Sequence, residues 1–105
     1  QRCNWREFHS VGPVLPVVPF DTFDQAIALA NDTPYGLAAS VFTENKETAQ
    51  KAARALQAGM VKTNQANTSR AENIFGGYKK SGVGRENGKY GFHDVTQKKM
   101  VAREK

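Results

Sequence analysis

The sequence has one cysteine, two histidines and no long apolar run in its 105 residues. The lone Cys3 excludes a disulfide within the chain and favours a reducing compartment, so we expect a cytoplasmic protein. No apolar run approaches the roughly 20 residues of a membrane-spanning helix, so we expect no membrane partner. His9 and His93 lie far apart without an accompanying cysteine pair, and we therefore expect no metal site.

The charge is distributed unevenly along the chain. Residues 1–60 carry five Lys or Arg against six Asp or Glu, whereas residues 61–105 carry ten against four. Such asymmetry marks a nucleic-acid face in some proteins, and in others a solvated surface or a face for an acidic partner or anionic cofactor. Because the cations are dispersed and few aromatic residues lie between them, we favour the second interpretation and expect no nucleic-acid partner.

The first 63 residues alternate between strand and helix patterns. Apolar residues recur at i, i+3, i+4 and i+7 after two capping residues, Thr22 and Asn45, which predicts two amphipathic helices. Gly59 is expected to end the second helix, and Pro16 places the first strand at a sheet edge. β-branched and apolar runs predict strands at 14–18, 38–43 and 60–63. This β-α-β-α-β order predicts an α/β fold with a partial parallel sheet, in which the 38–43 strand is buried.

A polar stretch and then a glycine-rich stretch, IFGGYKKSGVG, interrupt this alternation at residues 64–84. A loop of this length in a compact domain is usually functional. Its spacing fits neither a P-loop, which would need glycine at Val83, nor a dinucleotide fingerprint, which would need glycine at Asn87. Gly76-Gly77 permits a tight turn or a close approach. Phe75 is expected either to form one wall of a pocket or to pack back into the core.

Two short elements are expected after this loop. Residues 85–93 predict a short helix, and residues 95–103, VTQKKMVAR, predict a terminal strand of mixed polarity. A strand at a chain end leaves an open edge of unpaired backbone groups. We therefore expect the terminal strand to pair with another segment or another chain.

Three stretches recur here in the order and spacing of a known family. They are GPVLPVVPFDTFDQAIALANDTPYGLAASVFT, ALQAGMVKTN and IFGGYKKSGVGRENGKYG. Together they resemble the C-terminal part of the catalytic domain of the aldehyde dehydrogenase superfamily, from about Gly12 to Val101. The resemblance implies one segment, residues 1–105, of that domain, with an oligomerisation strand at about 95–105. It also implies oxidation of aldehydes to carboxylic acids with NAD or NADP, through a cysteine thiohemiacetal.

The resemblance places the catalytic cysteine, the general-base glutamate and the dinucleotide-binding domain upstream of the matched region. Cys3 does not match the motif of the nucleophile. The 105-residue chain alone is therefore expected to bind no cofactor and to be inactive. The resemblance implies that its partners are the rest of a dehydrogenase chain or identical subunits, as a homo-oligomer. The alternative is a non-catalytic module that associates with itself.

The resemblance also assigns roles to individual positions. His9 and Val11 stand where the family has a glutamate that binds the nicotinamide ribose and a phenylalanine near the nicotinamide, so both depart from the cofactor-binding pattern. Phe75 matches a residue that lines the aldehyde tunnel. The loop before it, including Ser69 and Arg70, matches positions that shape substrate selectivity. Arg70 is expected either to pair with a carboxylate-bearing aldehyde or to point to solvent.

Three further positions acquire roles in the same way. Glu86 resembles a buried acid that relays protons from the general base; the alternative is a helix-start glutamate favoured by the helix dipole. Arg85 and Gln97 resemble subunit-interface positions, although the family often has an acid where Gln97 stands.

Overall fold

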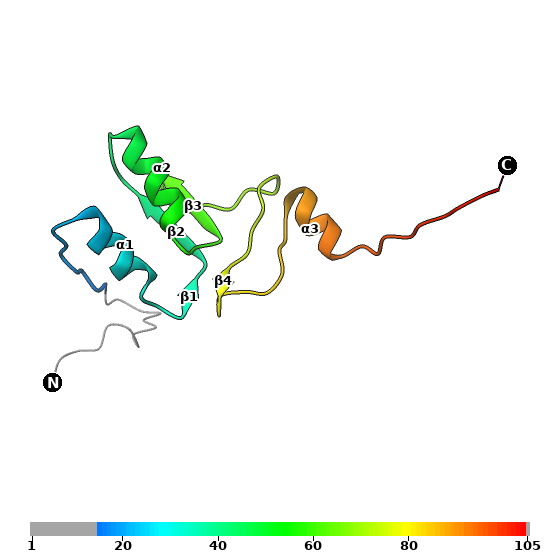
Figure 1. Ribbon diagram of the computed structural model, residues 1–105, viewed down its shortest axis with the longest axis horizontal. Helices are drawn as coiled ribbons and strands as arrows, with labels where there is room; N and C mark the ends of the chain where they lie inside the picture. The colour runs from blue at the N-terminus through cyan, green and yellow to red at the C-terminus, as the bar shows by residue number, and fades with distance from the viewer. Residues whose placement is uncertain (1–14, 105) are drawn as a thin grey trace.

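The computed structural model describes residues 15–104. The positions Cys3, His9 and Val11, for which the sequence raises specific expectations, lie outside these residues. Within these residues the chain forms three short helices and two small two-stranded sheets. A long C-terminal segment follows them (Figure 1). The elements are α1 (Phe23–Asn31), β1 (Tyr35–Gly36), β2 (Ala38–Val41), α2 (Lys46–Ala55), β3 (Met60–Thr63), β4 (Tyr78–Lys79) and α3 (Gly88–Asp94).

Both predicted capping residues begin a helix. The Thr22 hydroxyl accepts a hydrogen bond from the backbone N–H of Gln25 at 3.2 Å, at the start of α1. The Asn45 side chain accepts one from the backbone N–H of Thr48 at 3.0 Å, at the start of α2. In each case the side chain satisfies a backbone donor that the first helical turn leaves unpaired, which confirms the two helices and their first residues.

The end of α2 differs from the prediction. The helix ends at Ala55 with Leu56 as its C-cap, so Gly59 is not the residue that terminates it. The backbone N–H of Gly59 donates to the carbonyl of Gly36 at 3.0 Å instead, just before β3. A Cβ atom built at position 59 would overlap the carbonyl oxygen of Gly76. Glycine is therefore required here because two backbone segments cross in contact.

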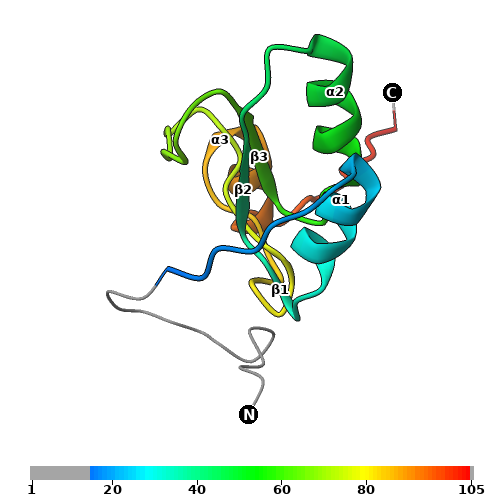
Figure 2. The same ribbon diagram turned by 90° about the vertical axis from the view of Figure 1, so that its left-hand side faces the viewer.

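The centre of the fold is a parallel strand pair covered by one helix. β2 pairs with β3 in parallel from Ala38↔Met60 to Val41↔Thr63, as the sequence predicts. Figure 2 shows α2 along one face of this pair, with α1 beside it. Ala52 of α2, at 2% exposure, is the buried hydrophobic residue of the described chain. The prediction of a buried 38–43 strand is wrong, because β2 ends at residue 41 and its residues alternate between exposed and half-buried.

The predicted sheet is also less extensive than expected. Residues 15–18 form no strand, and Val17 is 84% exposed. A strand forms only where a neighbour accepts its backbone hydrogen bonds, and no described strand pairs with this segment. A second, antiparallel pair forms instead, with Tyr35↔Lys79 and Gly36↔Tyr78 linking β1 to β4. The sheets are therefore mixed rather than one parallel layer.

The C-terminal segment carries no regular structure after α3. The predicted helix at 85–93 lies at Gly88–Asp94, and the predicted strand at 95–103 is not formed. Figure 1 shows this segment running away from the rest of the molecule. Met100 and Val101 are strongly exposed. No described segment lies beside this stretch to accept strand hydrogen bonds, which explains why the pattern alone does not produce a strand.

None of the helices within residues 15–104 has the length and apolar character needed to cross a membrane. In the same part of the chain, no three His, Cys, Asp or Glu side chains are grouped so that they would hold a metal ion.

Candidate functional site

The two ends of the glycine-rich stretch are joined by a backbone bridge between Phe75 and Glu86. Each residue donates its N–H to the carbonyl of the other, at 2.8 Å in both directions. Two residues that the sequence assigns to the site therefore lie side by side, although ten residues separate them in the chain. Phe75 is half-buried, so it is neither fully packed into the core nor fully exposed as the wall of an open pocket.

Glu86 lies beside Phe75 at the end of the glycine-rich stretch. Its side chain is exposed in the described chain, and the proton-relay role that the resemblance implies for it stays a prediction. The helix-start interpretation is wrong, because α3 begins at Gly88 and has no acid in its first turn.

The Arg85 side chain connects the two sides of the glycine-rich stretch through hydrogen bonds. Its guanidinium Nη1 donates to the carbonyl of Gly77 at 3.0 Å and to that of Gly84 at 2.8 Å. The same group lies over the Tyr78 ring, 5.6 Å from the centroid. Its backbone N–H donates to Asp94 Oδ2 at 2.7 Å, which ties the stretch to α3. A charged group with several acceptors holds both sides of the stretch together, and an interface role for Arg85 stays a prediction.

The turn inside this stretch depends on a buried glycine. A Cβ atom built at Gly77 would lie 2.5 Å from Cβ of Ser81. The Ser81 hydroxyl accepts a hydrogen bond from the N–H of Gly36 at 2.8 Å, which joins the turn to β1. The glycine-rich stretch, which contains β4, is therefore a folded turn joined to β1.

We call residues 64–73, which lead from β3 to the glycine-rich stretch, the variable loop. Asn64, with a positive φ of 54°, begins it. Its side-chain amide accepts from the N–H of Thr43 at 2.8 Å and donates to the carbonyl of the same residue at 2.9 Å. This two-way pairing imitates a backbone ladder and fixes the start of the loop to the chain that leaves β2.

The far end of the variable loop is fastened to the start of α3. Asn87, also at positive φ, donates its side-chain amide N–H to the hydroxyl of Ser69 at 3.3 Å. The N–H of Gly88 donates to the carbonyl of Ala71 at 2.9 Å. Ser69 is therefore hydrogen-bonded to the residue that directly follows Glu86. The structure thus brings Ser69, Phe75 and Glu86 into one region.

The middle of the variable loop is held by Lys62 of β3. Its ammonium donates to the hydroxyl of Thr68 at 2.8 Å and to the carbonyl of the same residue. A cavity of about 240 Å³ lies between β3 and the loop. Ser69 and Arg70 line it, whereas Phe75 does not. Its lining is Gly59, Met60, Val61, Lys62, Thr68, Ser69, Arg70, Asn73 and Ile74.

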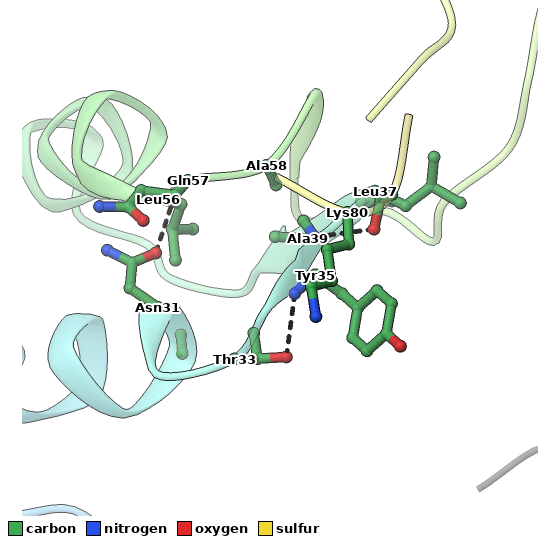
Figure 3. A pocket seen from close by; sticks show the side chains of 13 residues that line it. Asn31, Thr33, Tyr35, Leu37, Ala39, Leu56, Gln57, Ala58 and Lys80 are labelled. Carbon is green, nitrogen blue, oxygen red and sulfur yellow. Dashed lines mark hydrogen bonds between the residues drawn. The ribbon is translucent and has the colours of Figure 1, made fainter. Parts of the chain in front are cut away.

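A larger cavity of about 510 Å³ lies where α1 and α2 end, shown in Figure 3. Asn31 joins the two helix ends, because its side chain accepts from the N–H of Gln57 at 2.8 Å and donates to the carbonyl of Ala55 at 2.9 Å. The cavity wall includes apolar side chains such as Leu37 and Leu56. None of the predicted site residues within 15–104 lines it, so we place the candidate site at the variable loop and the glycine-rich stretch.

Lys62, Asn64 and Asn87 are the residues that sequence reasoning missed. Their partners lie 6, 21 and 18 positions away in the chain, so no local motif pairs them. One signal exists for the asparagines, since asparagine tolerates positive φ more readily than most residues. Gln97, one of the predicted interface residues, lies in the extended C-terminal segment.

Comparisons with known proteins agree on one family. The model of the aldehyde dehydrogenase family matches residues 7–101. The lactaldehyde dehydrogenase of Escherichia coli (strain K12) is 43% identical over 90 residues, which are 86% of this chain and 19% of that protein. The solved structure of an NAD-dependent aldehyde dehydrogenase from Sinorhizobium meliloti is 49% identical, with a TM-score of 0.79, over 82% of this chain and 17% of that one.

A second solved structure, the NAD⁺ complex of an aldehyde dehydrogenase from Bacillus cereus, has a TM-score of 0.79 at 46% identity. It covers 82% of this chain and 18% of the other. The solved neighbours have an α/β fold. The chain thus spans less than one fifth of the length of the relatives that it matches.

Proposed function

Because the chain belongs to the aldehyde dehydrogenase family, we propose that it forms the C-terminal part of the catalytic domain of an enzyme that oxidises aldehydes to carboxylic acids. Relatives named as NAD-dependent or solved with NAD⁺ support a nicotinamide cofactor, NAD or NADP, for the complete enzyme. Residues 1–105 supply part of the aldehyde tunnel and of the subunit interface. The catalytic cysteine, the general base and most cofactor contacts come from the rest of the enzyme.

The Phe75–Glu86 bridge carries this proposal. It holds an aromatic side chain, half-buried, against a region that also contains Ser69. An aromatic wall beside small polar side chains suits an apolar substrate with a polar reacting end. Arg70 lines the neighbouring cavity, where a guanidinium favours an aldehyde that also carries a carboxylate. Glu86, exposed in this chain, relays protons once the remaining domain covers it.

The C-terminal segment is proposed to complete the assembly. Its exposed Met100 and Val101 and its unpaired backbone suit addition to the sheet of an identical subunit. Gln97 lies in this segment and contacts that subunit. Arg85 contributes from the turn to which α3 is tied.

A second candidate is a non-catalytic module that associates with itself. Its support is the amount of apolar surface left uncovered, including Leu15, Phe42 and Val83. Exposed apolar surface on this scale drives association. The two proposals differ in whether the chain becomes part of an active dehydrogenase.

A hybrid enzyme tests the tunnel role. Residues 12–101 of this chain replace the matching part of the Sinorhizobium meliloti enzyme, and the aldehyde kinetics are compared for Phe75→Ala and the exposed-residue control Val83→Ala. We expect Phe75→Ala to lower kcat/KM by about tenfold, since a lost aromatic contact costs on the order of 1.4 kcal/mol. Equal kinetics for the two variants in a folded hybrid would contradict the role of Phe75.

A further inference from the structure

Lys62 of β3 donates a hydrogen bond to the middle of the variable loop. The start of the loop is fixed through Asn64 and its far end through Asn87 and Gly88. Between these anchors, Lys62 reaches across from β3 to Thr68. Residues 65–68 lie between the anchored Asn64 and Ser69, and the Lys62 contact restricts the last of them, Thr68.

The donor itself is held rigidly. Lys62 stands opposite Ser40 in the parallel β2–β3 pair and is half-buried. Its ammonium meets both the hydroxyl and the carbonyl of the same residue, Thr68. Two acceptors on one residue fix its orientation as well as its distance, and hydrogen bonds from a charged donor are stronger than neutral ones.

Thr68, the residue that Lys62 binds, lines the cavity beside the variable loop. Ser69 and Arg70 follow Thr68 directly, and all three line the 240 Å³ cavity together with Lys62. A shift of Thr68 would act on Ser69, which Asn87 holds from the other side, and through it on Arg70, the two residues to which we assign substrate selectivity. Residues that hold such groups from behind control the geometry of a site without touching its ligand.

We propose that Lys62 is a positioning residue that sets aldehyde selectivity by fixing Thr68, and through it Ser69 and Arg70. We call the contact between the Lys62 ammonium and Thr68 the latch. The effect of the latch on catalysis rests on the proposed function, whereas the existence of the latch does not. Lys62→Met removes all three donors and keeps a long unbranched side chain. Lys62→Arg keeps the charge but presents a planar fork in place of a compact ammonium, so it restores the latch only in part.

The first arm measures the latch in the full 105-residue chain. Trypsin cleaves after Arg70 within the variable loop, after Arg54 within α2 and after Arg103 in the exposed C-terminal segment. We expect Lys62→Met to speed cleavage at Arg70 by about tenfold, with Lys62→Arg between it and the native chain, because cleavage follows the population of the open loop. The rates at Arg54 and Arg103 should not change.

Cleavage after Arg54 and after Arg103 serves as the control for a change in cleavage after Arg70. Arg54 reports opening of the helix and Arg103 reports trypsin activity on an already exposed segment. Faster cleavage at Arg70 and Arg54 together, or no change at Arg70, would overturn the latch.

The second arm measures selectivity in the hybrid enzyme. We expect Lys62→Met to change the ratio of kcat/KM for an aldehyde with a carboxylate to that for a neutral aldehyde of equal length by about fivefold, with kcat for the neutral aldehyde preserved. A proportional loss for both aldehydes would overturn the selectivity role. An inactive but folded native hybrid would instead count against the proposed function, and the trypsin result would stand by itself.

Discussion

Single residues decide how the two loops of the site are held. Arg85 joins Gly77 to Gly84, and Lys62 joins β3 to Thr68. Each uses a charged donor with more than one acceptor, so one substitution removes several contacts at once. The conformation of the glycine-rich stretch therefore depends on the hydrogen bonds from Arg85 more than on the flexibility of its glycines.

Gly59 gives a sharp test at the residue scale. A methyl group at this position would overlap the carbonyl oxygen of Gly76, so β3 and the glycine-rich stretch would have to separate. We expect Gly59→Ala to lower the thermal midpoint of the hybrid enzyme by several degrees and its kcat/KM by about a hundredfold, since misplacement of a site by about 1 Å has effects of this size.

Gly84→Ala is the matched control for this change. The nearest atom to a Cβ built at Gly84 is Asp94 Oδ2 at 3.4 Å, an ordinary contact distance. We expect this variant to keep the midpoint and the kinetics of the native hybrid. A Gly59→Ala hybrid with native kinetics would show that the crossing of the two segments is not needed for the site.

The residue scale also shows what the sequence can predict. Thr22 and Asn45 were predicted as caps because each bonds a donor three positions ahead, so the signal is local. Phe75 and Glu86 were placed in one site only through the family resemblance, and their bridge spans ten residues. The contacts of Lys62 and Arg85 depend on the path of the folded loops, which no local pattern encodes.

Helices and strands differ in how well the sequence predicted them. α1 and α2 satisfy their hydrogen bonds internally, so a cap and an apolar stripe define each of them. β2 and β3 were predicted in the right order and formed a parallel pair, because each has the other as a partner. Residues 15–18 and 95–103 carry strand patterns, but no described strand pairs with either segment, and both remain exposed.

The C-terminal segment yields a prediction at this scale. We expect the 105-residue chain to associate with itself through residues 95–104, and Val101→Lys to weaken that association by placing a charge on an edge that must be paired. Light scattering at micromolar concentration measures the effect. Gln65→Lys, which adds the same charge in the exposed variable loop, should leave the size unchanged.

Two results would count against pairing through this segment. A native chain that is monomeric at these concentrations would exclude it. Association weakened equally by Val101→Lys and Gln65→Lys would attribute the effect to net charge, which is already +5 in this chain.

The whole molecule is open rather than closed around a core. Its Cα radius of gyration is 18.2 Å, whereas a compact domain of this length has about 13 Å. Ala52 is the buried hydrophobic residue among residues 15–104, and large apolar side chains are exposed along several elements. This shape agrees with a chain that covers less than one fifth of its relatives and shares the α/β fold of that part.

The central claim is that this chain supplies the wall of an aldehyde site and none of the reacting groups. Steady-state NADH formation from an aldehyde, measured for the purified 105-residue chain and for the hybrid under the same conditions, tests it most directly. The account predicts no NADH formation by the chain alone and sustained formation by the hybrid. Sustained NADH formation by the chain alone, or none by a correctly folded hybrid, would contradict it.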